Sequence, residues 1–306
     1  MTRHPSGLLQ MTAEIERALI RSEPVVALET SIVAHGLPAD IGVEVARECE
    51  ARVRGAGAVP ATVAVIDGAV RVGLDDADLE RLATGPDIRK VGPRDLATCA
   101  VSGASGATTV GGTIAVCTIA GIHFMATGGI GGVHRGWAET RDVSADLGEI
   151  ARSAVCVVCA GAKSLLDIPA TLETLETSGV PVIGYGTDTF PLFYVPESRY
   201  PVPDRADHPE AIAAAVAAHW GFARPTGLVI TQPVAAEAAL SAEEVETAIE
   251  EALAEAREQG IDGPRVTPFV LAALHGATRG RSLAANRRLV VDNAELAARV
   301  AAAYYA

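Results

Sequence analysis

The chain is poor in aromatic residues and in long hydrophobic runs. Only 4% of its 306 residues are Phe, Trp or Tyr although 49% are hydrophobic, so we expect a core of small aliphatic side chains. No run reaches the roughly 18 uninterrupted apolar residues of a membrane span. Residues 1–20 lack a basic segment followed by a continuous apolar one, so no secretory signal is expected.

Basic residues are fewer than acidic ones. The 25 Lys and Arg against 38 Asp and Glu give a formal net charge of −13. That balance argues against a nucleic-acid polymer or an anionic membrane as a partner. It does not exclude a small phosphate, because a phosphate needs only a local cluster of donors.

Cysteine is also scarce, and the 5 cysteines all lie in apolar surroundings. We expect reduced, buried thiols in a cytoplasmic protein. Cys156 and Cys159 have C-x-x-C spacing, but on a strand these two positions face opposite sides of the sheet. A zinc or redox site is therefore not expected there.

Several familiar site motifs are absent. The sequence contains no G-x-x-x-x-G-K-[ST], no G-x-S-x-G and no H-E-x-x-H. Its glycine cluster at 128–132 does not fit G-x-G-x-x-G, since position 134 is His134. Nothing here indicates a dinucleotide fold, a P-loop, an α/β-hydrolase or a zinc protease.

Short apolar runs alternate with segments of helical periodicity, which predicts an α/β fold. We expect a single domain over residues 1–306, a three-layer α/β/α structure with a central mixed sheet and a helical C-terminal part. Strands are expected at 25–28, 61–66, 154–160, 180–185 and 227–231, with a hairpin partner at 69–73. Helices are expected at 8–21, 41–54, 76–84, 168–178, 208–221, 242–259, 267–277 and 282–305, with another opening at 106–113.

Two segments carry more specific expectations. Ser241 and Glu244 have the spacing of a capping box at the start of a helix. Residues 187–200 form an aromatic loop that suits either a lid or an oligomer contact, and we prefer the contact.

Charged side chains stand where expected strands end. Glu29 follows the run 25–28, Lys90 ends another short run, and Lys163 follows 154–160. Open α/β sheets bind ligands at such ends. Each residue also has a plain alternative: Glu29 as a helix cap or turn residue, Lys90 in a solvated basic loop, and Lys163 as a solvated lysine in a glycine-rich connection.

The segment between these positions is rich in glycine. Gly128, Gly129, Gly131 and Gly132 indicate backbone that takes a positive φ or approaches another group closely. Helix starts are expected near 106–113 and at Ser144. A helix start offers backbone N–H groups to an anion, although a purely structural start is equally consistent.

The residue types permit a recognisable chemistry. A lysine in an apolar pocket can form a Schiff base with a carbonyl substrate, and a neighbouring glutamate can move protons. Aspartates such as Asp142 and Asp146, with water, suit Mn²⁺ or Mg²⁺. Together these residues indicate a carbonyl- or sugar-processing lyase or hydrolase, and spacing alone does not decide which.

Long motifs in order resemble one family. They are ALETSIVAHGLP, PATVAVIDG, KVGPRDL, TGGIGGVHRG, DVSADL, CAGAKSLLDI, LETLETSGVPVIGY, TDTFPLFY and TPFVLAALHGATRGRSL followed by AN. From about residue 8 to 304 the chain resembles pseudouridine-5′-phosphate glycosidase, the family that includes the indigoidine-cluster A proteins. The resemblance implies a lyase that reversibly cleaves the C–C glycosidic bond of pseudouridine 5′-phosphate to uracil and ribose 5-phosphate.

The same resemblance implies roles for particular residues. Lys163 corresponds to the lysine that attacks C1′ and forms an imine with ring-opened ribose, and Glu29 to the proton donor. Asp142 corresponds to a ligand of one Mn²⁺ per subunit, whose other ligands are largely water. Substrate contacts are implied at Lys90, Val110, Ser144, Ala145 and Asp146. The resemblance also implies a homotrimer, in nucleotide catabolism.

Two other functions are weighed against this one. Relatives exist that run the reaction as synthesis, so a C-ribosyl synthase joining ribose 5-phosphate to an aromatic natural-product acceptor is the main alternative. A non-catalytic sugar-phosphate-binding protein is a third, but such a protein would be expected to lose Lys163 or Glu29, and both are present.

Overall fold

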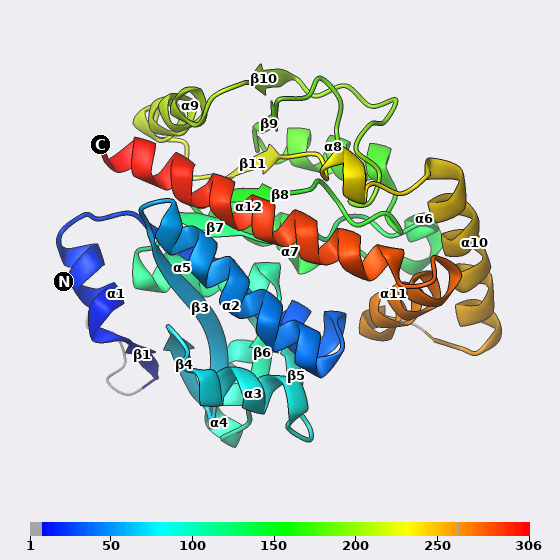
Figure 1. Cartoon of the computed structure of the whole chain (residues 1–306), viewed down its shortest axis with the longest axis horizontal. Coiled ribbons are helices and arrows are strands. Elements are labelled where there is room, and N and C mark those ends of the chain that lie inside the picture. Colours follow the sequence, from blue (N-terminus) through cyan, green and yellow to red (C-terminus); the bar gives the residue numbers. More distant parts are fainter. Residues whose placement is uncertain (1–7, 262) are drawn as a thin grey trace.

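Parallel strands form the centre of the fold, and helices cover both faces of the sheet (Figure 1). The computed structural model describes residues 8–261 and 263–306. Part of the segment examined for a secretory signal, residues 1–7, lies outside these ranges. Figure 1 shows α2 and α12 crossing the near face of the sheet, with α5 and α7 behind the strands.

The sheet is mixed, as predicted. From β3 to β10 neighbouring strands of the main path are parallel, whereas β4 pairs antiparallel with β3. β5 (Arg89–Val91) and β6 (Gly106–Thr108) form a branch, because β6 pairs antiparallel with β3. The main path runs β1 (Leu9–Met11), β4 (Ala69–Val72), β3 (Val59–Ile66), β2 (Val25–Leu28), β7 (Phe124–Ala126), β8 (Cys156–Cys159), β11 (Leu228–Thr231), β9 (Val182–Tyr185) and β10 (Asp204–Ala206).

The helices follow most of the expected segments. The first half of the chain contributes α1 (Ala13–Ile20), α2 (Ala39–Gly55), α3 (Asp76–Thr84), α4 (Leu96–Ser102), α5 (Val110–Ala120), α6 (Trp137–Thr140) and α7 (Ala145–Arg152). The second half contributes α8 (Ile168–Thr177), α9 (Pro209–Gly221), α10 (Ala242–Glu258), α11 (Val266–Ala277) and α12 (Arg281–Tyr305). Short turns of other helix types lie at η1 (Ile32–Gly36), η2 (Pro93–Asp95), η3 (Ala236–Ala238) and η4 (Gly263–Arg265).

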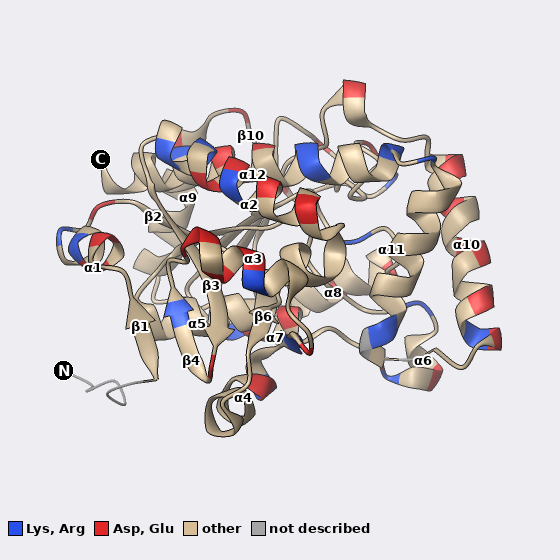
Figure 2. Cartoon of the chain, turned by 60° about the horizontal axis from the view of Figure 1, so that its bottom comes forward, with Lys and Arg blue, Asp and Glu red and all other residues tan. Residues whose placement is uncertain are grey.

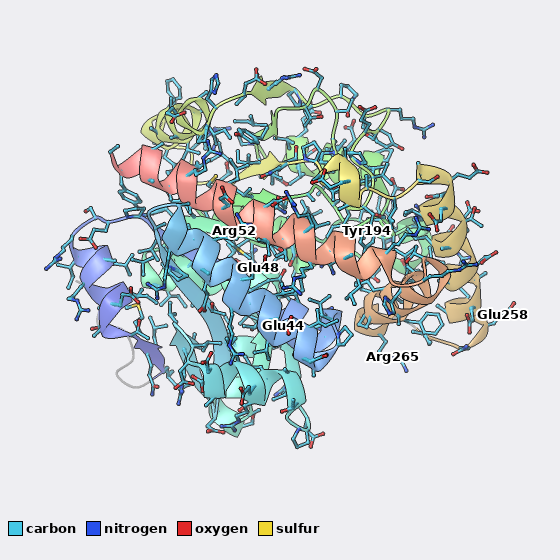
Figure 3. All side chains as sticks on the ribbon, viewed as in Figure 1. Glu44, Glu48, Arg52, Tyr194, Glu258 and Arg265 are labelled. Atoms are coloured by element: carbon cyan, nitrogen blue, oxygen red, sulfur yellow. The ribbon has the colours of Figure 1, made fainter. Side chains whose placement is uncertain are left out.

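Buried aliphatic residues explain why these strands sit at the centre. Every residue of β2, β7, β8 and β11 is buried, as expected for parallel strands covered on both faces. Helix α12 packs against α2, α9 and the strands β2, β7 and β8. Ion pairs at the surface also join α2 to α12, and Figure 3 shows Glu44, Glu48 and Arg52 along α2.

Two expected helix starts are wrong. Residues 9–11 pair with β4 as a strand, and the first helix begins only after Thr12, whose hydroxyl accepts from the Ile15 N–H. Similarly, 106–108 form β6, and Thr109 caps α5 by accepting from the Gly112 N–H. Both differences arise because pairing with a distant strand overrides the local pattern.

One further expectation is corrected. Ser241 precedes α10 but its side chain makes no capping bond, and Glu244 pairs with Arg281 instead. In the aromatic loop, Phe190, Phe193 and Tyr194 are buried within this chain as core residues, whereas Tyr200 is half-buried. An oligomer contact made by this loop stays a prediction. The ring centroids of Phe193 and Tyr194 lie 4.6 Å apart in an edge-on arrangement.

The prediction of free, buried thiols is confirmed. All five cysteines are free and buried, and Cys156 and Cys159 lie on β8. Burial raises the pKa of Cys159 to about 12, so its thiol is a poor nucleophile. In the described part of the chain, no helix combines the length and the apolar character needed to cross a bilayer.

Candidate functional site

The candidate site lies at the carboxyl ends of β2, β7 and β8. These strands are parallel neighbours, so the residues that follow them meet at one edge of the sheet. Two adjoining cavities open there. The inner cavity is lined by Glu29, His35, Gly128, Gly129, Phe193 and Asn286, and the outer cavity by Gly131, His134, Asp142, Ser144, Ala145 and Asp146. Ser31, Lys90, Lys163 and Thr267 border both cavities.

Glu29 is the buried acid of the inner cavity. It directly follows β2 and is 8% exposed. Its carboxyl oxygens accept hydrogen bonds from the hydroxyls of Ser31 and Thr127. Neither bond caps a helix, so the arrangement favours the reading of Glu29 as a site residue.

Lys163 stands where the two cavities join. Its N–H donates to the Ile130 carbonyl at 3.1 Å, and its carbonyl accepts from the Leu166 N–H at 3.0 Å. Just before it, Gly161 has φ +78°, and a Cβ there would lie 2.0 Å from the Pro191 carbonyl oxygen. Glycine is therefore required for the chain to turn from β8 and present the lysine.

Lys90 lies on β5 and is directed into the same space. Burial lowers the pKa of Lys90, and the positive charge of Lys163 lowers it further, whereas Asp146 and Glu29 act in the opposite direction. Two amines and two carboxyls are therefore close enough to influence one another. An anion bound between the amines would relieve their repulsion.

Asp146 ties together three parts of the outer cavity. One carboxyl oxygen accepts from the Gly111 N–H at 2.8 Å and the other from the Gly131 N–H, also at 2.8 Å. Ser144 begins α7, and its hydroxyl accepts from the Asp146 N–H at 3.2 Å. The expected helix start at Ser144 is thus confirmed, and Asp146 fixes the starts of α5 and α7 to the glycine loop.

The remaining predicted residues take different positions. Ser144 and Ala145 border the outer cavity at the start of α7. Val110 borders neither cavity and is 1% exposed, so a ligand could reach only its backbone N–H at the start of α5. Its role as a substrate contact remains a prediction.

Asp142 presents a half-buried carboxylate to the outer cavity. Its Oδ2 lies 3.8 Å from Nδ1 of His134, and the Asp142 carbonyl accepts from the His134 N–H at 3.0 Å. Burial lowers the pKa of His134, and the charge of Asp142 opposes that shift. Across residues 8–261 and 263–306, no three His, Cys, Asp or Glu residues are gathered as a metal-binding group.

The glycine loop 128–132 is shaped by close approach and not by a positive φ. A Cβ at Gly131 would lie 2.3 Å from Ser144 Oγ, and one at Gly132 would lie 2.4 Å from Thr171 Oγ1. The Cβ of a residue replacing Gly129 would lie 2.5 Å from the Phe193 ring. Of the two explanations offered by the sequence, close packing is the one that applies.

The pattern analysis gave no role to two residues of the inner cavity. Asn286, on α12, is 4% exposed, and its Oδ1 has no hydrogen-bond partner among the described residues. Nε2 of His35, on η1, is also buried and has no partner among the described residues. A buried polar atom without a partner is costly, so both atoms indicate a ligand that is hydrogen-bonded there. Asn286 falls within the RSL and AN motif, which was the available signal.

Comparisons with known proteins find relatives over nearly the whole chain. The chain is 49% identical over 297 residues to a pseudouridine-5′-phosphate glycosidase of Herpetosiphon aurantiacus, covering 97% of this chain and 98% of that protein. It is 51% identical over 294 residues to a pseudouridine-5′-phosphate glycosidase of Streptomyces griseus, covering 96% of this chain and 91% of that protein.

Solved structures give the same result. The prealnumycin C-glycosynthase AlnA, solved in complex with ribulose 5-phosphate, superposes with a TM-score of 0.90 at 42% identity, covering 98% of each chain. An indigoidine synthase A-like protein of Thermotoga maritima superposes with a TM-score of 0.91 at 32% identity, covering 100% of this chain and 99% of that one. The family model described as indigoidine synthase A like protein matches residues 14–303. The chain therefore belongs to the indigoidine synthase A-like family.

Proposed function

We propose that this protein reversibly cleaves the C–C glycosidic bond of pseudouridine 5′-phosphate, giving uracil and ribose 5-phosphate. The observation that carries this proposal is the meeting of Lys163 and Glu29 at one cavity, with Lys90 beside them. The high identity to proteins named pseudouridine-5′-phosphate glycosidase supports the same substrate.

The bond itself explains why a lysine is needed. A C–C glycosidic bond has no leaving heteroatom, so protonating an exocyclic oxygen, as O-glycosidases do, is not available. Lys163 Nζ attacks C1′ as the C1′–O4′ bond breaks, so the ribose ring opens and the proton lost by the amine passes to O4′. Glu29 then supplies a proton to the base carbon. The lone pair on the lysine nitrogen then forms the C=N bond while the electrons of the C1′–carbon bond pass to the base. Hydrolysis of the imine releases ribose 5-phosphate and restores the lysine.

The two cavities divide the substrate between them. The outer cavity suits the phosphate, because Lys90 and the starts of α5 and α7 border or approach it. The inner cavity suits the base, because the unpartnered Oδ1 of Asn286 can accept from a ring N–H. This division accounts for anion binding by a chain with a net charge of −13.

We further propose one Mn²⁺ per subunit, held by Asp142. A single carboxylate facing a wide cavity fits a hard cation that keeps most of its water ligands, and it does not fit a metal that needs several thiolates or imidazoles. When bound, the ion would supply positive charge to orient the anionic sugar phosphate. Exhaustive chelation should abolish both activity and a calorimetric Mn²⁺-binding signal, and Asp142→Asn should lose the binding signal as well.

We also propose that the protein acts in the cytoplasm as a homotrimer. The free, buried state of all five cysteines supports a reducing compartment. Light scattering coupled to gel filtration tests the trimer, and a monomer mass would contradict it.

The central experiment separates the two acceptors. Purified protein is given ribose 5-phosphate with uracil, or with a polycyclic aromatic acceptor, and products are separated by chromatography. We expect pseudouridine 5′-phosphate from uracil. Product only from the aromatic acceptor would favour the C-ribosyl synthase, which the similarity to the C-glycosynthase keeps as the second candidate.

Borohydride trapping with ribose 5-phosphate then identifies the nucleophile. An added mass on the peptide containing Lys163 is expected, and an adduct on a different lysine would contradict the assignment. Glu29→Gln should still trap ribose 5-phosphate but should lose cleavage of the C–C bond. Unchanged turnover in that variant would remove Glu29 from the mechanism.

A further inference from the structure

Arg135 makes three hydrogen bonds that no part of the proposed mechanism uses. It follows His134 in the VHRG motif. Its guanidinium donates two hydrogen bonds to the Glu246 carboxylate, from NH1 to Oε1 at 2.5 Å and from NH2 to Oε2 at 2.9 Å. The NH2 group also donates to the Ser164 carbonyl at 3.1 Å. A planar fork of donors makes such a double contact, which a lysine amine does not reproduce.

These bonds join two parts of the chain that are far apart in sequence. Ser164 directly follows the nucleophile Lys163, and its hydroxyl donates to the Leu192 carbonyl at 2.6 Å. Glu246 lies on α10, a helix with acidic residues along its length (Figure 2). The hydrogen bond to Arg135 lowers the pKa of Glu246, so the carboxylate is ionised at neutral pH.

Helix α10 in turn packs against α11. Thr267, Pro268 and Leu271 of α11 border the inner cavity. Helix α11 therefore borders the inner cavity with α10 packed against it, and Arg135 connects α10 to the backbone beside Lys163.

We infer that Arg135 is a positioning residue, which couples the position of the helix pair α10–α11 beside the inner cavity to the position of Lys163. The inference rests on the proposed role of Lys163 as the nucleophile. Arg135 borders neither the inner nor the outer cavity, so it acts through Ser164 and Glu246 and not on the substrate. Small displacements of a reacting group slow a reaction strongly, by about 100-fold for about 1 Å.

The chain offers a matched control, an arginine of α12 that pairs with the same helix α10. Arg281 pairs with Glu244 of α10, and within the described residues its guanidinium is not hydrogen-bonded to the loop that carries Lys163. Arg281→Gln therefore removes an ion pair that anchors α10 and leaves the Ser164 bond in place. Arg135→Gln removes both the ion pair with Glu246 and the hydrogen bond to the Ser164 carbonyl. Arg135→Lys keeps a positive charge beside Glu246 but lacks the planar guanidinium that makes the double contact.

The first experiment compares single-turnover rates of borohydride-trapped adduct formation with ribose 5-phosphate. Arg135→Gln and Arg135→Lys should slow adduct formation by about 10- to 100-fold, with Arg135→Lys keeping the melting temperature of the unaltered protein. Arg281→Gln should trap at the unaltered rate. Equal rates for Arg135→Lys and the unaltered protein, or equal slowing by Arg281→Gln, would overturn the inference.

A second measurement does not depend on the activity. Hydrogen exchange in the ligand-free protein should show faster exchange of the Lys163 and Leu166 amides in both Arg135 variants and not in Arg281→Gln. Unchanged exchange in the Arg135 variants would overturn the coupling. If the unaltered protein traps no ribose 5-phosphate, the proposed function fails, and the exchange pattern still decides whether Arg135 holds this loop.

Discussion

Replacing Asp146 tests whether its carboxylate has a structural role separate from the metal role proposed for Asp142. Asp146 is 4% exposed, and its two oxygens each accept a backbone N–H at 2.8 Å, from Gly111 and Gly131. Asp146→Asn keeps one acceptor but turns an NH₂ group toward the other N–H donor. A hydrogen bond to a charged group contributes about 1.5–3 kcal/mol, and an unsatisfied buried donor costs about 1–3 kcal/mol.

We therefore expect Asp146→Asn to lower the free energy of unfolding by about 2–3 kcal/mol. With an m-value of about 3 kcal/mol/M, the urea midpoint should fall by roughly 0.7–1 M. Asp142→Asn is the matched control, because no backbone N–H among the described residues donates to the half-buried Asp142 carboxylate. It should lose Mn²⁺ binding while its free energy of unfolding stays within about 0.5 kcal/mol of that of the unaltered protein. An unchanged midpoint for Asp146→Asn would refute this account.

Three other predictions concern packing, charge and proton linkage. Gly131→Ala places a Cβ 2.3 Å from a serine oxygen and should abolish activity. Gly276→Ala, which has open space on α11, should be neutral or should stabilise the fold by up to about 1 kcal/mol. Full activity in Gly131→Ala would contradict the packing argument. Phosphate binding should raise the lowered pKa of Lys90 and take up protons above that pKa, as measured by calorimetry in buffers of different ionisation enthalpy; proton release would contradict it. Arg287→Ala should lower the free energy of unfolding by less than about 1 kcal/mol, because its ion pairs with α2 are exposed. Leu289→Ala should lower it by about 2–5 kcal/mol, because that side chain is buried. Thermal unfolding of both variants measures the difference, and the reverse order would be inconsistent with the burial of these side chains.

The Lys90 linkage also sets how stability depends on pH. The folded-state pKa of Lys90 is lowered. At pH values between the folded and the unfolded pKa, the unfolded chain therefore binds more protons than the folded chain. The contribution of this group to stability therefore rises as pH rises from the folded pKa toward the unfolded value near 10.4. A bound phosphate should reverse the trend, since it favours the charged amine.

The strand ends and their charged residues could be read from local patterns. Fully apolar runs such as 25–28 and 156–159 are typical of parallel strands. Glu29 directly follows the first run, and Lys163 comes four positions after the second. Helix starts such as Ser144 were also correct, because a capping hydroxyl bonds within two or three residues of itself. The long motifs supplied the family, which the comparisons confirm. The roles that the resemblance implies for single residues stay predictions.

Other features of the site depend on contacts between distant segments, and only the folded chain decided them. Asn286 reaches the inner cavity because α12 packs across β2, β7 and β8, and nothing near position 286 encodes that crossing. Likewise, Asp146 meets the backbone of Gly111, 35 positions earlier, and Arg135 meets Glu246, 111 positions later. Local sequence determines which segments become strands and helices, since those bonds span a few residues, whereas the packing of whole elements determines which side chains share a cavity.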